Sequence, residues 1–146
     1  MATLNTEHLL QCIKTLEYSL LRLESSPPKS IDYEVFRNAT VKGFELTLET
    51  SGKLLRKGLK AYIGNPRIVD ELTYKDLFRY AVKHGLLETD AAERWFAYRD
   101  NRNNTAHDYG IAFANITLKL LPRFIKDAKA LQQILQSKLG FDDARP

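Results

Sequence analysis

Residues 99–109 decide how the chain folds, and they read Arg-Asp-Asn-Arg-Asn-Asn-Thr-Ala-His-Asp-Tyr. Strongly helical sequence flanks this stretch on both sides, whereas its centre, Asn103-Asn104-Thr105, is poor helix-forming sequence. Asn and Thr side chains compete with a helix for its backbone hydrogen bonds. We therefore expect one helix to end and another to begin here, with a polar site at the junction.

Apolar residues recur every three or four positions on both sides of this stretch, a spacing that places them on one face of a helix. No segment shows the alternation typical of a strand. The pattern predicts an all-α fold, an up-and-down bundle of four to five helices with short connections. The bundle is expected to be one domain over residues 1–140, followed by a polar tail at 141–146. The expected helices span about 5–24, 33–62, 74–83, 90–102 and, after the break, 111–139.

Local signals mark the ends of several of these helices. Thr6 and Asp32 are the predicted N-caps of the first two helices, and Thr73 with Asp76 resembles a capping box at the start of the third. Pro122 falls inside the last helix. It predicts a kink there, because proline lacks the N–H that an interior residue donates.

Two glycines interrupt the second helix. Gly43 and Gly52 each cost about 1 kcal/mol relative to alanine in a helix interior, so each needs a reason. Close packing against another helix is one reason, and the approach of a ligand to the backbone is the other. On the same helix Glu49 and Lys53 are four residues apart and are expected to pair weakly.

Aromatic residues are dense just before the central stretch, at Trp95, Phe96 and Tyr98. A bundle of this size usually buries its apolar stripes internally. The same aromatic group is also able to supply a dimer surface.

Composition sets the class of protein. The chain has 146 residues, a formal net charge of +4 and one cysteine, Cys12, so no intrachain disulfide can form. The mild excess of positive charge permits an anionic partner without demanding one. No apolar run approaches the roughly 20 residues of a membrane span, and residues 1–8 do not resemble a secretory signal. We expect a cytoplasmic protein that does not bind a membrane.

Several kinds of catalytic motif are missing from the sequence. It has no glycine-rich phosphate loop, no His-Glu-x-x-His and no pair of cysteines for zinc. A nucleotidyltransferase of the polymerase-beta type needs a Gly-Ser pair and an Asp-x-Asp pair, and neither occurs. The chain is therefore not expected to be such a catalyst itself, and no metal or cofactor is predicted.

The central stretch contains the residue types that metal-independent RNA cleavage requires. His107 has a side chain that can exchange protons near neutral pH, and Arg102 has a planar fork that can bind a phosphate with two hydrogen bonds. Both are candidate catalytic residues, and Arg99 and Asn103 are candidate substrate-binding residues. One histidine and one arginine per chain is a small set, so a two-fold homodimer that brings two copies together is expected.

Simpler roles for these residues stay open. A lone histidine in a helical protein is more often structural than catalytic, and Tyr109 is equally well explained as a partly buried aromatic residue with its hydroxyl in water. In an unbroken helix five residues turn by about 500°, which would point Arg102 and His107 about 140° apart. Their convergence therefore requires the helix to break between them or the arginine to reach around.

The spacing Arg102-x4-His107-x-Tyr109 resembles the Arg-x4-His-x-Tyr signature of HEPN-domain proteins encoded beside a minimal nucleotidyltransferase. Phe44-Glu45 and the Glu49/Lys53 pair also resemble positions of that family. Members are described both as nucleotidyltransferase substrate-binding subunits and as HepT-like ribonuclease toxins. Gly43 and Gly52 depart from the family, which often has Arg and Trp there. That departure leaves open whether the second helix contributes to the site.

The resemblance implies two functions. In the first, Arg102 and His107 form the ribonuclease pair of a toxin–antitoxin system, and a cognate minimal nucleotidyltransferase adds AMP to Tyr109. In the second, the chain is a non-catalytic subunit that binds a nucleotide or acceptor substrate for that nucleotidyltransferase. RNA or a nucleotide is the expected ligand in either case. A purely scaffolding bundle is the third alternative.

Overall fold

The computed structural model describes residues 4–105 and 111–139, and these residues are helical apart from short connections. They form α1 (Glu7–Glu24), α2 (Ile31–Ile63), α3 (Pro66–Asp70), α4 (Tyr74–Lys83), α5 (Thr89–Thr105) and α6 (Ile111–Ile134). A π-helical turn, η1 (Leu135–Leu139), continues α6. The described part of the chain has no strand, and the predicted all-α bundle is confirmed.

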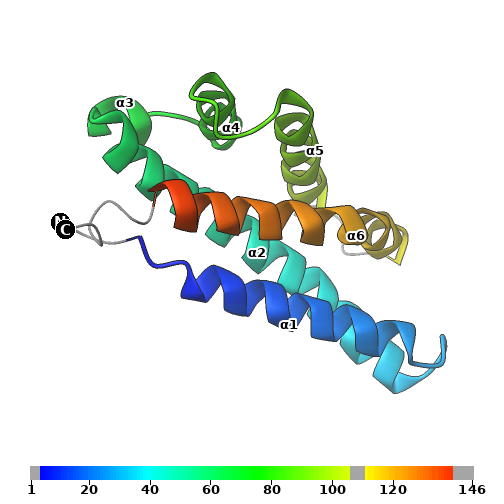
Figure 1. Cartoon of the computed structure of the whole chain (residues 1–146). Helices are drawn as coiled ribbons and strands as arrows, with labels where there is room; N and C mark the ends of the chain where they lie inside the picture. Colours follow the sequence, from blue (N-terminus) through cyan, green and yellow to red (C-terminus); the bar gives the residue numbers. More distant parts are fainter. Residues whose placement is uncertain (1–3, 106–110, 140–146) are drawn as a thin grey trace.

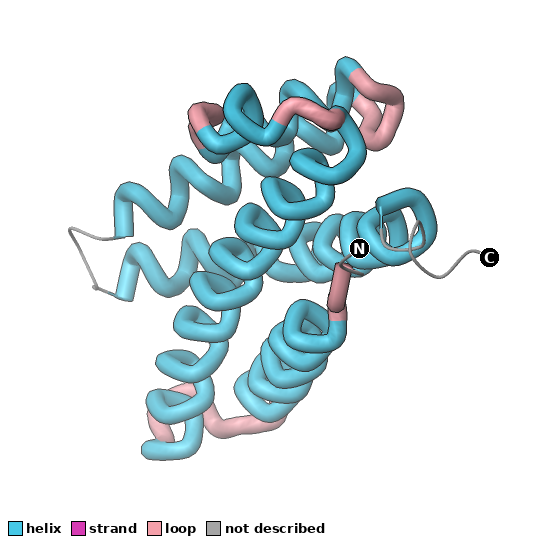
Figure 2. Tube along the Cα trace, turned by 90° about the vertical axis from the view of Figure 1, so that its left-hand side faces the viewer, coloured by secondary structure: helices cyan, strands magenta, loops and turns pink. Residues whose placement is uncertain are grey.

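The long helix α2 is the central element. Figure 1 shows α1 running beside it in the opposite direction, and α6 packs against both of these helices. The pair formed by α4 and α5 covers another part of α2, near α3. Figure 2 shows the same arrangement from the side. Because α2 touches every other helix group, its side chains can reach residues that lie far away in the sequence.

Part of the core is an aromatic cluster at the place where α2, α4, α5 and α6 meet. The rings of Phe78 and Trp95 stack with their centroids 4.8 Å apart, and Phe124 meets Phe44 edge-on at the same distance. Trp95 and Tyr98 are buried. The sequence-based idea that these aromatics supply a dimer surface is therefore wrong for Trp95 and Tyr98, because packing inside one chain already covers them.

The helix starts agree with the predictions only in part. Thr73 caps α4 as expected, with its Oγ1 accepting a hydrogen bond from the backbone N–H of Asp76 at 3.2 Å. The predicted cap of α2 is wrong, because Ser30 rather than Asp32 accepts the hydrogen bond from Tyr33 N–H, at 3.0 Å. Asp32 lies inside the first turn, where its negative charge still favours the helix dipole.

The N-cap position of α1 serves a tertiary contact instead of a local one. Thr6 stands at this position but makes no capping hydrogen bond with its side chain. Its Oγ1 accepts a hydrogen bond from Nε2 of Gln132 in α6, at 3.0 Å. The threonine therefore ties the start of α1 to the C-terminal part of α6.

The proline inside α6 and the glycine after α2 have the structural effects that their residue types predict. The ribbon of α6 changes direction in both views, and Pro122 lies within this helix. α2 ends at Gly64, which has a positive φ of 77° that a glycine adopts readily. The stretch after it, which the sequence left undefined, contains α3. The guanidinium of Arg56 donates to the carbonyl oxygens of Val69 and Leu72 and fixes this segment.

None of the described helices combines the length and apolar character needed to cross a membrane.

Candidate functional site

The predicted helix junction lies between α5 and α6. α5 ends at Thr105 and α6 begins at Ile111, and Figure 1 shows the two helices running in different directions. Residues 103–105, where the sequence predicted the break, are helical and form the end of the described part of α5. His107 and Tyr109 lie outside the described residues. Of the predicted site residues, the structure describes Arg99, Arg102 and Asn103.

Arg102 lies in the last turn of α5 and faces α2. Its Nε is 3.4 Å from Oε2 of Glu45, which forms an ion pair with it. The side chain of Arg102 is 28% exposed and that of Glu45 is 11% exposed, so the pair is largely shielded from water. A carboxylate in this position restricts where the guanidinium can lie and balances part of its charge.

Arg99 lies one turn earlier on α5 and has a similar partner. Its Nη1 donates to Oε1 of Glu49 at 2.9 Å, and its guanidinium carbon lies 4.6 Å from the centre of the Tyr74 ring. Among the described residues, the ion pair of Glu49 is this one, and the weak pair predicted with Lys53 is not formed. The tertiary contact takes the place of the local one, and it uses a partner that is better shielded from water, since the Arg99 side chain is 28% exposed and Lys53 is exposed.

Tyr74 explains why α2 has a glycine at position 52. A Cβ atom on Gly52 would lie 2.9 Å from Cδ2 of the Tyr74 ring and closer still to Cε2. The hydroxyl of Tyr74 donates to the carbonyl oxygen of Leu48 at 2.9 Å. Close packing is therefore the reason for Gly52. Burial raises the pKa of the Tyr74 phenol, and the nearby guanidinium of Arg99 opposes this shift with a smaller effect.

The two helices present complementary charges at matching intervals. Glu45 and Glu49 are four residues apart on α2, and Arg102 and Arg99 are three apart on α5, so each pair lies on one helix face. Side chains of α2 therefore contact both arginines of the predicted site, although Gly43 and Gly52 of the same helix depart from the family sequence. The spacing of these four residues can be read from the sequence. Which glutamate pairs with which arginine depends on how α2 and α5 pack.

Asparagines near the end of α5 have contrasting environments. Asn103 is exposed, as a substrate-binding residue must be. Asn101 is buried, and its Nδ2 donates to Oγ1 of Thr117 in α6 at 3.0 Å. This hydrogen bond joins the two helices close to the junction. Asn101 was not singled out by the sequence, since an asparagine inside a polar stretch gives no sign of burial.

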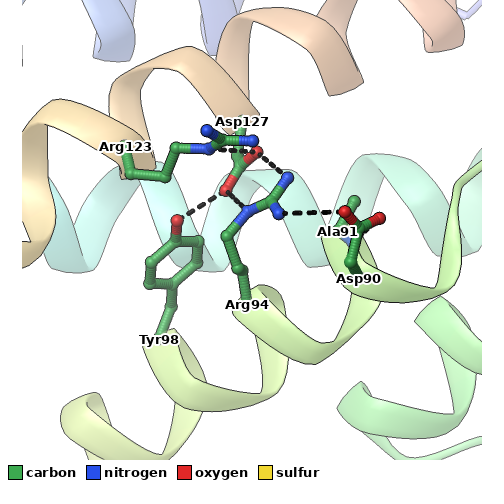
Figure 3. Close-up of polar contacts among 6 residues, drawn as sticks. All are labelled: Asp90, Ala91, Arg94, Tyr98, Arg123 and Asp127. Carbon is green, nitrogen blue, oxygen red and sulfur yellow. Dashed lines mark hydrogen bonds and ion pairs between the residues drawn. The ribbon is translucent and has the colours of Figure 1, made fainter.

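A second polar cluster lies toward the other end of α5 and is drawn in Figure 3. Asp127 of α6 is 7% exposed and accepts two hydrogen bonds from Arg94, at Nε and Nη2, both of 2.9 Å. The hydroxyl of Tyr98 donates to the same carboxylate at 2.5 Å, and Nε of Arg123 lies 3.7 Å away. The cluster holds α5 and α6 in a fixed relation to each other.

The cluster shifts the titration of its members. Burial raises the pKa of the Tyr98 phenol, and the hydrogen bond to Asp127 raises it further. The hydrogen bonds with Asp127 also raise the pKa of Arg94, against the opposing effect of burial. Tyr98 therefore remains a hydrogen-bond donor, and Arg94 remains a cation, throughout the physiological range.

Known proteins resemble the chain over most of its length. A curated relative from Haemophilus influenzae, named "Probable ribonuclease HepT", is 26% identical over 113 residues, which are 77% of this chain and 76% of the relative. A solved Haemophilus influenzae structure, described as the substrate-binding domain of a nucleotidyltransferase, superposes with a TM-score of 0.80 at 24% identity. The match covers 91% of this chain and all of that one.

A solved structure from Thermus thermophilus has the same fold, with a TM-score of 0.72 at 23% identity, covering 88% of this chain and 98% of that one. Residues 11–137 match the family described as "Nucleotidyltransferase substrate binding protein like". That match takes in α2 and α5, which carry the described residues of the candidate site, and α6. The chain belongs to this nucleotidyltransferase substrate-binding-like family.

Proposed function

We propose that the protein is a metal-independent endoribonuclease that acts as a homodimer and as the toxin of a toxin–antitoxin pair. The observation that carries this proposal is the pair of arginines on α5, Arg99 and Arg102, each held by a carboxylate of α2. They lie just before the segment that contains His107. The curated relative named as a probable ribonuclease supports the same activity.

The chemistry assigns one task to each residue. His107 takes the proton from a ribose 2′-hydroxyl, whose oxygen then forms a bond to the adjacent phosphorus as the bond to the 5′-oxygen breaks. A protonated histidine, supplied by the second copy across the two-fold axis, gives its proton to the departing 5′-oxygen. Arg102 stabilises the charge that grows on the phosphoryl oxygens, while Arg99 and Asn103 hold the strand. The products are a 2′,3′-cyclic phosphate and a free 5′-hydroxyl.

The partner minimal nucleotidyltransferase controls this activity by modifying Tyr109. The phenol oxygen attacks the α-phosphorus of ATP, and pyrophosphate leaves. The attached AMP adds bulk and negative charge close to the cations that receive RNA. It therefore blocks the site by volume and by neutralising Arg102.

Cleavage by the pure protein tests the activity. RNA incubated with it in EDTA is expected to be cut, and the His107→Ala and Arg102→Ala variants are expected to leave the RNA intact. His8→Ala and Arg67→Ala are the matched controls, since His8 and Arg67 are exposed and lie outside the central stretch. Intact RNA with pure, unmodified wild-type protein contradicts the proposal, as does equal cleavage by His107→Ala.

Two further measurements test the dimer and its control. Light scattering after size exclusion is expected to give twice the 16.8 kDa mass of one chain. Coexpression with the genomic neighbour is expected to add the mass of one or more AMP groups, and Tyr109→Phe is expected to prevent the addition. A monomer, or AMP on another residue, overturns that part of the proposal.

A second function has its own support in the family description, which names nucleotidyltransferase substrate binding. In this alternative the chain binds a nucleotide or acceptor substrate for its partner and cuts nothing. It predicts no cleavage by the chain alone, and tighter nucleotide binding by the complex than by either protein. The EDTA cleavage assay and a nucleotide titration of the mixed proteins separate the two functions.

A further inference from the structure

A groove of about 540 Å³ lies between the segment that enters α5 and the C-terminal half of α6. It is distant from the helix junction, because Arg94 at its edge lies eight residues before Arg102, or about 12 Å along the helix. Its size is within the range of about 300–1,000 Å³ that is usual for small-molecule sites. Nothing in the function proposed above uses this groove.

The lining of the groove has an excess of positive charge. Four basic residues contribute to it, namely Arg94, Arg123, Lys126 and Lys138, against the two acidic residues Glu88 and Asp127. Lys126 and Lys138 are exposed, and the side chain of Arg123 is 58% exposed. Three long cationic side chains are thus accessible at one groove, where they can meet a negatively charged ligand.

The buried carboxylate in the lining does not cancel these cations. Arg94 donates two hydrogen bonds to Asp127 and Tyr98 donates a third, as Figure 3 shows. Arg123 lies 3.7 Å from the same carboxylate, beyond hydrogen-bond distance. Arg94 therefore satisfies Asp127, and Arg123 and the lysines are left with donors that can turn toward a ligand.

The remaining lining is apolar. Leu86 is buried, Leu87, Ala91 and Ile134 are half-buried, and all four line the same groove as the cations. A small inorganic anion would use the positive rim but would leave this apolar wall in water. A ligand that fits both has a weakly polar part joined to an anionic group such as a phosphate.

We propose that this groove binds a nucleoside phosphate, either as a free nucleotide or as one unit of an RNA strand. The phosphate lies among Arg123, Lys126 and Lys138, and the base lies against the apolar wall. The choice of a nucleoside as the apolar part rests on the proposed function, whose substrate is RNA. The choice of a phosphate rests on the charge of the groove alone.

Calorimetric titration of the full chain at low salt in EDTA tests the proposal. The probes are AMP, adenosine, inorganic phosphate and a short oligoadenylate, with the oligoadenylate titrated into His107→Ala so that it cannot be cut. AMP or the oligoadenylate is expected to bind more tightly than adenosine or phosphate. The Lys126→Glu/Lys138→Glu variant is expected to bind about tenfold more weakly or worse, since two charged contacts are reversed.

Lys14→Glu/Lys42→Glu is the matched control, because it changes the net charge equally at exposed lysines that do not line the groove. Arg123→Gln is the second groove variant, and circular dichroism confirms that each variant folds. AMP binding identifies a free nucleotide as the ligand, and groove-dependent binding of the oligoadenylate alone identifies a strand. The proposal is overturned if no probe binds, if adenosine or inorganic phosphate binds as well as the tighter of AMP and the oligoadenylate, or if the control loses as much affinity.

The outcomes for the groove and for the nuclease are independent. Arg102→Ala is expected to abolish RNA cleavage while leaving AMP binding unchanged. If instead Arg102→Ala abolishes AMP binding and the groove variants keep it, the nucleotide binds at the junction and the groove proposal fails while the nuclease proposal stands. If the groove binds AMP and the pure protein cuts no RNA, the groove proposal stands and the nuclease proposal fails.

Discussion

The ring of Tyr74 in α4 packs directly against Gly52 of α2, closer than any side chain at position 52 would allow. The same ring lies beside the guanidinium of Arg99, which pairs with Glu49 one turn before Gly52. Gly52 has a low helix propensity, but α2, α4 and α5 meet at this residue beside the candidate site. The packing of that point and the orientation of Arg99 depend on each other.

Gly52→Ala is expected to lower the free energy of unfolding by about 1–3 kcal/mol, since the new methyl group overlaps the Tyr74 ring and outweighs the gain in helix propensity. Gly43→Ala in the same helix is the control. Its Cβ would meet Cδ1 of Leu16 at 3.3 Å, so its effect is expected to stay below about 1 kcal/mol. Urea denaturation measures both. The cost of Gly52→Ala should disappear in a Tyr74→Ala background, and a cost that persists there would disprove the clash.

Glu45→Gln is expected to destabilise the protein more than Glu49→Gln. The Glu45 side chain is 11% exposed and that of Glu49 is 44% exposed, so water screens the second pair more strongly. We expect losses of about 1–2 kcal/mol for Glu45→Gln and less than about 1 kcal/mol for Glu49→Gln. Denaturant titration of the two variants checks the order. Equal losses would mean that burial does not govern the strength of these pairs.

Tyr98→Phe is expected to lower stability by about 1–2 kcal/mol, because it removes one hydrogen bond to the buried carboxylate of Asp127. Tyr62→Phe, at a residue that is 45% exposed, is the control and is expected to change stability by less than about 0.5 kcal/mol. Thermal and urea unfolding give both values. A double-mutant cycle with Asp127→Asn should show that the two changes are not additive, and strict additivity would contradict a direct bond between them.

Alkaline pH is expected to reduce the contribution of Tyr98. Its pKa is raised in the folded protein, so the folded state binds the phenol proton more tightly than the unfolded state does. The contribution is therefore fully present below the unfolded value of about 10 and falls as the pH rises through the folded value. The difference in unfolding free energy between wild type and Tyr98→Phe should be constant up to about pH 9 and shrink above about pH 10. A difference that grows with pH would show the opposite shift.

Much of the fold was predictable because helix formation and helix capping depend on neighbours in sequence. The spacing of apolar residues predicted the helices, and the Thr73–Asp76 pair predicted the start of α4. The break predicted at residues 103–105 is not seen there, because these residues continue α5. The start of α2 was misplaced by two residues. Ser30 and Asp32 are both good caps, and the geometry of the preceding turn decided between them.

The surroundings of the site depended on the packing of helices that lie far apart in the chain. Arg99 and Glu49 are separated by 50 residues, and no local rule distinguishes that pairing from the one expected between Glu49 and Lys53. Packing between helices distant in sequence also determines the burial of Trp95, the contact of Tyr74 with Gly52 and the cluster around Asp127. Spacing in sequence determines which side chains share a helix face. Only the packing of one helix against another determines what that face meets, because contact energies act across space rather than along the chain.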